Sequence, residues 1–221
     1  MSERIITTVA GEELELHPYR AVYWAAQRCL WLADLHLGKA AHFQRAGLAV
    51  SSRVADKNWE RLYHLLDVYH PETVIFLGDL FHSAYNREWD VLGHFIRNFY
   101  RVRFHLVRGN HDILEEEHYQ DFGIHLHEKS LSWGPFDFTH EPREEQPQLL
   151  QYNVAGHIHP AVRMFGKANQ SLRLPCFYFG EYQGLMPAFG AFTGTAVIRP
   201  QRSDQVFLIA DDRIIAAENT D

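Results

Sequence analysis

The first half of the chain alternates short apolar runs with amphipathic segments. Residues 4–17 alternate like paired strands on either side of Ala10-Gly11-Glu12, which predicts a β-hairpin. Apolar side chains recur every three to four residues from about 51 to 69 and from about 87 to 100, so both segments are predicted to be helices. The short apolar runs around these helices predict strands at residues 21–24, 29–33, 73–77 and 103–107.

The second half of the chain is predicted to be mostly strand. A short acidic helix is expected at about residues 113–119, and the charged segment 141–148, with its two prolines, is expected to be a loop or a frayed helix start. Seven strands are predicted at residues 130–133, 136–139, 152–155, 172–179, 195–198, 206–209 and 214–217. This order of elements favours a layered α/β architecture with two sheets. Since no linker, repeat or low-complexity segment interrupts it, we expect one domain over residues 1–221.

Composition narrows the class of protein. No apolar run among the 221 residues is long enough to cross a bilayer, and the N-terminus lacks the apolar core of a secretory signal. A cytoplasmic protein without a membrane partner is therefore expected. Cys29 and Cys176 lie in apolar runs, which favours two buried thiols over a disulfide. The net charge of −7 argues against a broadly basic nucleic-acid surface, although bound divalent cations would reverse the local field.

Polar residues gather where the predicted strands end. Residues two apart on an extended chain point the same way, so the two members of an Asp-x-His or His-x-His pair can reach one centre. Carboxylate, imidazole and amide ligands together suit borderline to hard divalent ions, which could clamp a phosphate. The strand ends that predict such a metal site are Asp34-Leu35-His36, Gly78-Asp79, Gly109-Asn110-His111-Asp112, Thr139-His140 and Gly156-His157-Ile158-His159.

Each of these pieces has a simpler interpretation when it is taken alone. An Asp-x-His at a strand end is usually a turn former, and a single histidine such as His140 is usually a partly buried side chain. Two imidazoles on one strand face, as at His157 and His159, are harder to explain without a metal or water. The histidines in no ligand spacing are expected at the surface or between elements: His17, His42, His64, His70, His94, His105, His118, His125 and His127.

Taken together, the five motifs resemble the calcineurin-like metallophosphoesterase family, and they span most of the chain. The resemblance implies an α/β fold, a four-layer αββα sandwich of two mixed β-sheets flanked by helices. It also implies a binuclear metal centre. In that centre one divalent ion is held by Asp34, His36 and His159, the other by Asn110, His140 and His157, and Asp79 bridges both.

The resemblance further implies hydrolysis of a phosphate ester. A hydroxide bridging the two metals would attack phosphorus in line while the ions neutralise the phosphate oxygens. His111 would donate a proton to the leaving alkoxide, and Asp112 would orient or tune its imidazole. Arg108 matches a family position that can contact phosphate, for which its planar donors are suited. A solvated charge at the loop entrance is the alternative for Arg108.

Finer motifs resemble one branch of the family, the bacterial DNA-ligase-associated metallophosphoesterases, which are placed among DNA-damage-response endonucleases. These motifs are WLADLHLGKA at residues 31–40, GDLFHS at 78–83 and LMPAFGAFTG at 185–194. The resemblance implies a phosphodiesterase in DNA repair that acts on single-stranded or damaged DNA and uses Mn²⁺, with iron or zinc as alternatives. It also implies association with an ATP-dependent DNA ligase and a helicase.

Two segments beside the predicted ligands have open roles. Lys39, His42 and Arg45 could follow a nucleic-acid backbone, or they could be ordinary surface charges. His82 and Ser83 could line a pocket or form a turn.

The substrate also stays open at this point. The aromatic-rich stretch 177–192 could stack bases, although core packing is favoured for it. A phosphomonoesterase, or a hydrolase of nucleotides or sugar nucleotides, is the alternative enzyme. A non-catalytic scaffold is disfavoured because the predicted ligands and the predicted proton donor His111 are all present.

Overall fold

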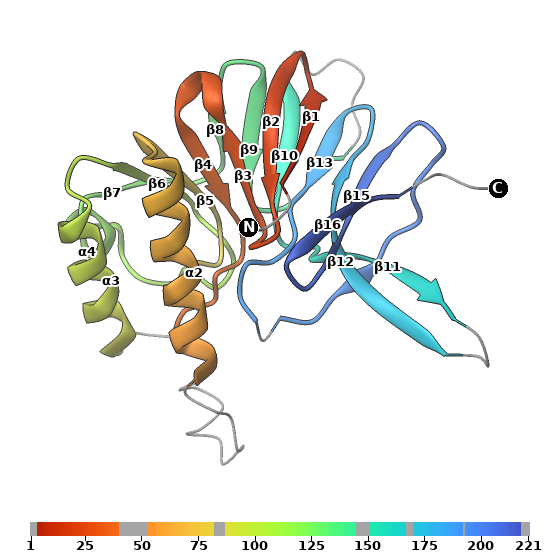
Figure 1. Cartoon of the computed structure of the whole chain (residues 1–221). Helices are drawn as coiled ribbons and strands as arrows, with labels where there is room; N and C mark the ends of the chain where they lie inside the picture. The colour runs from red at the N-terminus through yellow and green to blue at the C-terminus, as the bar shows by residue number, and fades with distance from the viewer. Residues whose placement is uncertain are drawn as a thin grey trace.

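Two β-sheets packed face to face form the frame of the molecule, and helices lie against one of them (Figure 1). This computed structural model describes residues 4–39, 53–81, 87–144, 151–166, 170–191 and 193–217. Among the described helices, none is both long and apolar enough to cross a membrane.

The first sheet has seven strands in the order of the chain. The four N-terminal strands pair antiparallel, with the 3-10 helix η1 (Ala25–Gln27) between the third and the fourth, and the last four pair parallel. Parallel strands end at the same edge of a sheet, so polar residues that follow them can meet there. The strands are β1 (Ile5–Val9), β2 (Glu12–His17), β3 (Ala21–Trp24), β4 (Cys29–Leu32), β5 (Thr73–Leu77), β6 (Arg103–Val107) and β7 (Ile124–His127).

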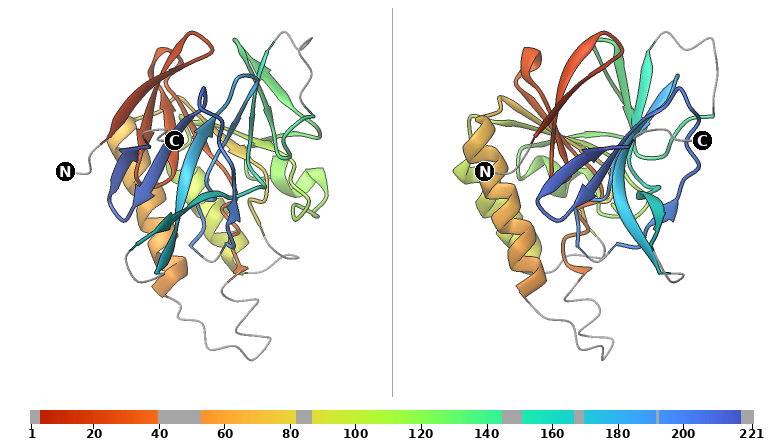
Figure 2. Two further views of the ribbon diagram at one scale, coloured as in Figure 1. Left: turned by 90° about the vertical axis from the view of Figure 1, so that its right-hand side faces the viewer. Right: turned by 45° about the vertical axis from the view of Figure 1, so that its right-hand side comes forward.

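Three helices cover the outer face of the first sheet: α2 (Arg53–Tyr69), α3 (Arg87–Asn98) and α4 (Glu116–Gln120) (Figures 1 and 2). Their apolar stripes are buried against the strands. Leu62 of α2 and Phe95 of α3, for example, belong to the same buried cluster as Phe76 of β5. Burial of these helical stripes explains why the three-to-four-residue period in the sequence located α2 and α3.

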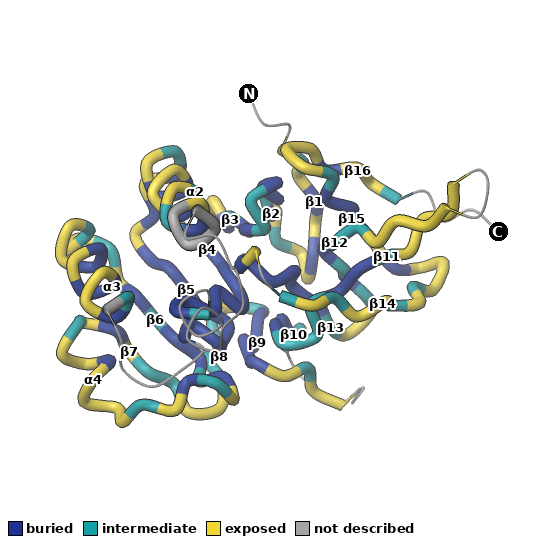
Figure 3. Tube along the Cα trace, turned by 90° about the horizontal axis from the view of Figure 1, so that it is seen from below, coloured by how far each residue is buried: buried dark blue, intermediate teal, exposed yellow. Residues whose placement is uncertain are grey.

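The second sheet has nine strands and is also mixed. Its centre holds β10 between β9 and β13, and both neighbours run parallel to β10. The strands are β8 (Leu131–Trp133), β9 (Phe136–Thr139), β10 (Tyr152–Ala155), β11 (Pro160–Phe165), β12 (Ser171–Phe179), β13 (Gln183–Leu185), β14 (Ala196–Val197), β15 (Gln205–Ala210) and β16 (Arg213–Ala216). Buried residues, dark blue in Figure 3, lie along the strands of both sheets.

The core between the sheets is rich in aromatic side chains. Trp31 of β4 lies with its ring centroid 4.9 Å from those of Phe136 and Phe138 of β9, and both contacts are edge-on. Aromatic rings prefer such T-shaped contacts, which add to the stabilisation from burial. This packing fixes the ends of β4 and β9 relative to each other, and both ends carry predicted site residues.

The α/β class and the two-sheet sandwich predicted from the sequence are confirmed. Within the described ranges, the α-helices α2, α3 and α4 all lie on the outer face of the first sheet, so three of the four implied layers are seen. The outer face of the second sheet carries a small buried cluster of Cys176, Val206 and Leu208. Cys29 and Cys176 are free and buried as predicted, and burial raises the pKa of each thiol to about 12.

Three strands were not predicted from the sequence, and their composition explains why. β7 has the sequence Ile-His-Leu-His, and its histidines were assigned to the surface. β11 begins at Pro160, directly after a predicted ligand, where a proline can occupy the first position of a strand. β13 has only three residues, one of them glycine, and it forms because β10 and β12 pair with it. Tertiary context creates these strands.

His17 is fully buried between β2 and α2, with its ring centroid 5.9 Å from those of His64 and Tyr69, so the predicted position between elements is confirmed and the surface alternative is wrong. Its Nδ1 accepts a hydrogen bond of 3.0 Å from the backbone N–H of Tyr19. Burial, together with the charges of Arg4 and His64, lowers the pKa of His17 from 6.5 to about 4. The folded state therefore holds this imidazole in its neutral form.

We expect His17 to make the stability of the fold dependent on pH. Because its folded-state pKa is lowered, its contribution is fully present above about pH 6.5 and is lost as the pH falls through about 4. At pH 5 the loss in unfolding free energy is about 2 kcal/mol. His17→Asn keeps an acceptor near the Nδ1 position but does not titrate. Denaturant unfolding of both proteins at pH 7.5 and pH 5 should show a smaller drop for the variant; equal drops would contradict this assignment.

Candidate metal centre

The seven residues predicted as metal ligands follow the carboxyl ends of strands from both sheets. Figure 3 views the molecule from below, the side toward which β4 and β5 end in Figure 1. The order of strands brings these five ends together: Asp34 and His36 follow β4, Asp79 follows β5, Asn110 follows β6, His140 follows β9, and His157 and His159 follow β10.

The first group of converging side chains is Asp34, His36 and His159. Each offers a ligand atom, and these atoms lie within 4.8 Å of one another. Asp34 is fully buried, and its Oδ1 lies 3.4 Å from Nε2 of His159. Burial lowers the pKa of His159, but the Asp34 carboxylate and the Gly194 carbonyl outweigh burial and leave that pKa above its ordinary value. A cation at this group would replace that proton.

The second group is centred on His140. Its Nδ1 lies 3.0 Å from the carbonyl oxygen of Leu77, which can only accept, so Nδ1 carries the proton and Nε2 presents a lone pair. That Nε2 lies 3.0 Å from Oδ1 of Asn110 and 3.1 Å from Nδ1 of His157. Three predicted ligands thus direct donor atoms to one point. The carbonyl of Leu77 is the kind of outer partner that fixes the tautomer of a metal-binding histidine.

Asp79 lies between the two groups. Its Oδ2 is 3.7 Å from Nε2 of His36, and its Oδ1 is 3.4 Å from Nε2 of His140. One carboxylate oxygen therefore faces each group, which is the placement expected of a bridging ligand. Carboxylate, imidazole and amide oxygen donors arranged in two adjoining groups fit a pair of divalent ions.

Backbone conformation marks the same residues. In the described part of the chain, ten non-glycine residues have a positive φ, and half of them are predicted ligands. Non-glycine residues rarely adopt this region, and strained residues cluster where a site requires their side chains in a particular direction. The five ligands have φ between 48° and 62°: Asp34, His36, Asp79, His157 and His159.

Gly78, which precedes Asp79, allows His140 to approach the β5 end closely. A Cβ atom added at Gly78 would collide with the His140 ring, including Nδ1. Gly78 also has a φ of +77°, in the region that disfavours L side chains. Gly11, in the β1–β2 turn, has a similar φ of +82° but open space within 4 Å of an added Cβ.

We expect Gly78→Ala to damage the centre far more than Gly11→Ala. Both substitutions incur the conformational cost of a positive φ, about 1 kcal/mol. Gly78→Ala should lose a further 1–3 kcal/mol, roughly, through overpacking against His140, and it should weaken metal binding. Denaturant unfolding and metal titration of the two variants measure both effects. If Gly11→Ala loses as much metal affinity as Gly78→Ala, contact with His140 is not the cause.

His111 lies at the rim of the centre. Its side chain is 41% exposed, and its Nε2 lies 4.0 Å from Oδ2 of Asp79. The His111 ring centroid is 5.6 Å from that of His36, and its backbone N–H donates a 2.9 Å hydrogen bond to Oδ1 of Asp79. The imidazole is therefore held beside the predicted ligands while it remains open to solvent, which suits a group that exchanges protons with a substrate.

Asp112 is buried beneath the loop that carries Asn110 and His111. Its two carboxylate oxygens accept hydrogen bonds from the backbone N–H groups of Gly109, at 2.9 Å, and Phe81, at 3.1 Å. Burial raises the pKa of Asp112 to about 7, although these hydrogen bonds oppose the shift. Asp112 therefore fixes the position of His111 through the backbone, and a direct effect on the imidazole stays a prediction.

Arg108 is directed at the loop rather than at the candidate ligands. Its Nη1 donates hydrogen bonds to the carbonyl oxygens of Asp112, at 2.6 Å, and Leu114, at 2.9 Å. Its Nε lies 3.0 Å from a carboxylate oxygen of Glu128, and the guanidinium lies over the ring of Tyr119. These contacts make Arg108 a support of the loop, so the implied phosphate contact stays a prediction.

The distinctive stretch 185–194 supports the loop that carries Asp34. The backbone N–H groups of Phe189 and Gly190 donate to the carbonyl oxygens of Ala33 and Asp34, at 2.8 Å and 3.1 Å. Phe189 is fully buried, so core packing, favoured from the sequence for residues 177–192, is confirmed there. Sequence reasoning missed Arg20, whose Nη1 donates to the carbonyls of Ala188 and Gly190. A lone arginine after β2 gives no sequence signal of this role.

Of the flanking residues with open roles, Lys39 lies near the centre. Burial lowers its pKa, and the negative charges of Asp79 and Asp34 oppose that shift. His42, Arg45, His82 and Ser83 lie outside the described residues.

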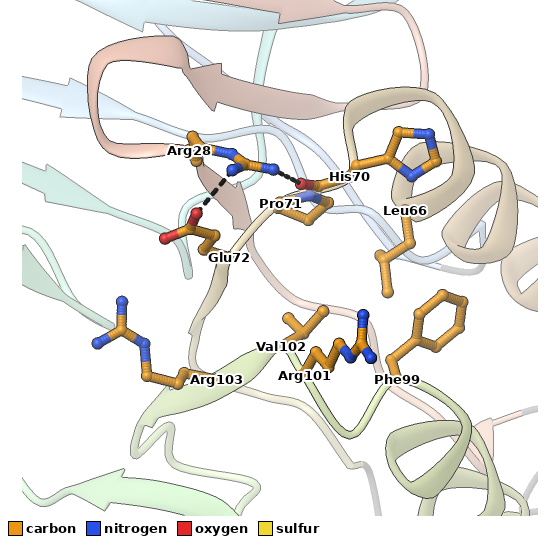
Figure 4. Close-up of a pocket in the computed structure, with 9 residues that line it drawn as sticks. All are labelled: Arg28, Leu66, His70, Pro71, Glu72, Phe99, Arg101, Val102 and Arg103. Atoms are coloured by element: carbon orange, nitrogen blue, oxygen red, sulfur yellow. Dashed lines mark hydrogen bonds and ion pairs between the residues drawn. The ribbon is translucent and has the colours of Figure 1, made fainter.

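Two pockets lie at opposite ends of the first sheet. One of about 500 Å³ adjoins the centre, and its walls include Asn110 and His140 together with the cationic Lys129 and Arg143. A larger pocket of about 610 Å³ lies at the other ends of the parallel strands (Figure 4). There Arg28 is already paired with Glu72 at 2.7 Å. Open α/β sheets keep their chemistry at the carboxyl ends, so the smaller pocket is the one that belongs to the site.

The chain resembles known proteins in sequence and in fold. Residues 28–180 match the family described as calcineurin-like phosphoesterase. The crystal structure of the Pseudomonas putida nuclease MPE is similar, with a TM-score of 0.81 and 28% identity over 97% of this chain and 100% of that one. A phosphoesterase from E. coli, Yfce, gives a TM-score of 0.44 and 15% identity over 85% of this chain and 96% of that one.

No curated protein matches the chain closely enough to count as a relative. The family match nevertheless covers well over half of the 221 residues, and it contains all seven predicted ligands. The chain therefore belongs to the calcineurin-like phosphoesterase family and is a metal-dependent phosphoesterase.

Proposed function

We propose that this enzyme is a two-metal phosphodiesterase that cuts single-stranded or damaged DNA internally, in DNA repair. One observation carries the two-metal part: the oxygens of Asp79 face His36 on one side and His140 on the other. The similarity to the Pseudomonas putida nuclease supports a nucleic-acid substrate.

The ligand assignment follows the two groups. Asp34, His36 and His159 would hold one ion, Asn110, His140 and His157 the other, and Asp79 both. This mixture of oxygen and nitrogen donors suits Mn²⁺, with iron or zinc as alternatives. When bound, the two ions would supply positive charge for the phosphate oxygens and lower the pKa of a coordinated water.

The chain's own residues would then position the substrate and move a proton. The buried Asp34 carboxylate accepts the backbone N–H of His157 at 2.9 Å, which joins the ends of β4 and β10. His111, at the exposed rim, would pass its proton to the oxygen of the leaving alkoxide. Asp112 and Arg108 would hold the loop of His111 in place through the hydrogen bonds described above.

The surroundings of the centre favour a chain-like substrate over a small one. The adjoining pocket of about 500 Å³ carries Lys129 and Arg143 beside Asn110 and His140, so cationic groups extend past the candidate ligands; Glu128 and Glu141 also line it, and Arg143 is paired with Asp137 at 2.8 Å. A phosphate backbone passing the centre could pair with Lys129 as a second phosphate contact, which a phosphomonoester does not require. Hydrolysis of phosphomonoesters, nucleotides or sugar nucleotides is the second candidate, and a non-catalytic scaffold is disfavoured by the complete donor set.

The remaining proposals concern the setting of the enzyme. We propose that it acts in the cytoplasm as one domain over residues 1–221, and that it works with an ATP-dependent DNA ligase and a helicase. Co-purification of the tagged chain from its own host would test the two protein partners. Recovery of neither one after DNA damage would remove that part of the proposal.

Cleavage of circular DNA is the experiment that tests the function, because a circle has no end to trim. We expect Mn²⁺-dependent linearisation of single-stranded circles, faster than nicking of duplex circles. We also expect bis-p-nitrophenyl phosphate to turn over faster than p-nitrophenyl phosphate. A chelator-treated sample is the control. Turnover of monoesters alone, with circles left intact, would favour the second candidate and remove the nuclease.

A further inference from the structure

A two-stranded arm leaves the second sheet directly after the candidate ligand His159. It consists of β11, which starts at Pro160, and the antiparallel β12 (Figures 1 and 2). The outer halves of both strands are exposed. One end of the arm therefore lies at the candidate metal centre, because Pro160 directly follows His159, and its far end extends into solvent.

Two arginines face each other on this arm. Arg163 of β11 and Arg173 of β12 are direct partners in the register, and both are exposed. Directly opposed residues project from the same face, where two like charges destabilise the strand pair. In the part of the chain that the structure describes, neither guanidinium is paired with a carboxylate. An external anion would remove this repulsion.

An exposed aromatic ring shares the face of the arginine pair. Phe165 stands two residues beyond Arg163 on β11, so it projects to the same side, and 78% of it is exposed. A phenylalanine exposed to this extent offers a flat ring face on which a base can stack. Guanidinium groups beside an exposed ring are the combination that binds single-stranded nucleic acid, since phosphates pair with the cations and bases stack on the ring.

The local charge favours a polyanion even though the chain as a whole is acidic. The sequence carries a net charge of −7, yet none of its 28 acidic residues falls between positions 146 and 180. The arm and the ligand pair His157 and His159 lie in this acid-free segment. A nucleic-acid strand that reaches the centre along the arm would thus meet the arginines of the arm, and residues 146–180 would place no carboxylate in its way.

We propose that the β11–β12 arm binds single-stranded nucleic acid beside the cleaved phosphate, through Arg163, Arg173 and Phe165; this inference rests on the proposed function. The arginine pair stands four residues from His159, about 13 Å along an extended strand. A small diester held at the centre cannot reach that far, whereas a DNA strand can. The arm would therefore affect binding and cleavage of DNA and leave hydrolysis of small diesters unchanged.

Binding without divalent metal tests the arm separately from catalysis. The variants are Arg163→Gln/Arg173→Gln and Phe165→Ala. The matched controls are Arg101→Gln/Arg213→Gln, two exposed arginines elsewhere, and Ile215→Ala, an exposed apolar residue of β16. Fluorescence anisotropy of an oligothymidine about 20 nucleotides long, in chelator and over a range of salt, gives the affinity. Turnover of bis-p-nitrophenyl phosphate with Mn²⁺ and thermal unfolding are measured on the same proteins.

We expect the double arginine variant to bind about 10–100-fold more weakly at low salt, and its salt-dependence slope to fall by about 1.4, the value for two lost phosphate contacts. Phe165→Ala should bind roughly 5–100-fold more weakly. Small-diester turnover should stay within about twofold, and thermal stability should not fall, since removing the arginine repulsion cannot weaken the strand pair.

The proposal that the arm binds nucleic acid would be overturned by wild-type-like DNA binding in the variants, by equal losses in the controls, or by no binding of the wild-type protein. Binding through the arm without any DNA cleavage would instead contradict the proposed function and leave the arm standing. A parallel loss of small-diester turnover would show that the substitutions disturb the centre through the fold, which also overturns the arm as a binding element.

Discussion

Asp79→Asn is expected to empty the metal centre and reduce phosphodiester hydrolysis to background. Asp79 presents one oxygen to His36 at 3.7 Å and the other to His140 at 3.4 Å, so it is the predicted ligand that faces both groups. The amide keeps the shape but removes the negative charge, and one oxygen becomes an NH₂ group that cannot bind a cation. Without the negative charge of Asp79 between them, two divalent ions should bind with an affinity lower by several orders of magnitude. Metal analysis of the purified protein and turnover of bis-p-nitrophenyl phosphate measure the two effects.

Asp204→Asn is the matched control, because Asp204 is also a buried aspartate and lies in the β14–β15 connection, away from the candidate ligands. It should retain metal and activity. Asp79 also accepts the backbone N–H of His111, so thermal unfolding of metal-free samples must show that Asp79→Asn still folds. A folded Asp79→Asn protein that keeps two metals per chain would contradict the bridging assignment.

The candidate centre was largely predictable because its residues follow strand ends. Apolar runs show where strands end, and parallel strands bring their carboxyl ends to one edge, so the sequence alone predicts that Asp34, Asp79 and Asn110 lie together. The structure added what spacing cannot give. The bond from His140 to the Leu77 carbonyl fixes a tautomer, and the positive φ of the ligands reflects local strain that no residue pattern reports.

The directions of the Arg108 and Asp112 side chains could not be predicted from the sequence. The family resemblance implied that Arg108 contacts phosphate and that Asp112 orients the imidazole of His111, and both roles stay predictions. In the structure both are drawn into the backbone of the loop, because buried N–H and C=O groups there need partners. Residues of a tight loop divide between facing the substrate and holding the loop, and sequence position alone does not separate these roles.

The sequence pattern located some elements of the fold and missed others. Helices with a clear apolar stripe, such as α2, were located to within a few residues, because their burial depends on their own period. The β11 strand was missed because its outer half, with Arg163 and Phe165, is exposed and does not alternate like a half-buried strand. Exposed side chains break the alternation expected of a half-buried strand. The same exposed side chains are the ones through which we propose that β11 binds nucleic acid.

His111→Ala is expected to lower DNA cleavage by about 10²–10⁴-fold while metal content stays near that of the wild-type protein. His111 is 41% exposed at the rim, and it is absent from both groups of converging ligand atoms. Two substrates with different leaving groups separate a role of His111 as acid from a role in substrate binding. A deoxyribose alkoxide needs a proton to depart, whereas p-nitrophenolate leaves as a stable anion. The loss should therefore be large on DNA and small on bis-p-nitrophenyl phosphate.

His94→Ala, at an exposed histidine of α3, is the matched control and should change neither substrate's turnover. Equal losses of His111→Ala on DNA and on the aryl diester would contradict proton donation, because a missing acid cannot slow the departure of a group that needs none. A parallel fall in bound metal would instead make His111 part of the metal centre through its backbone bond to Asp79. Only a proton donor at this position explains a large loss of DNA cleavage when hydrolysis of the aryl diester and the metal content are both retained.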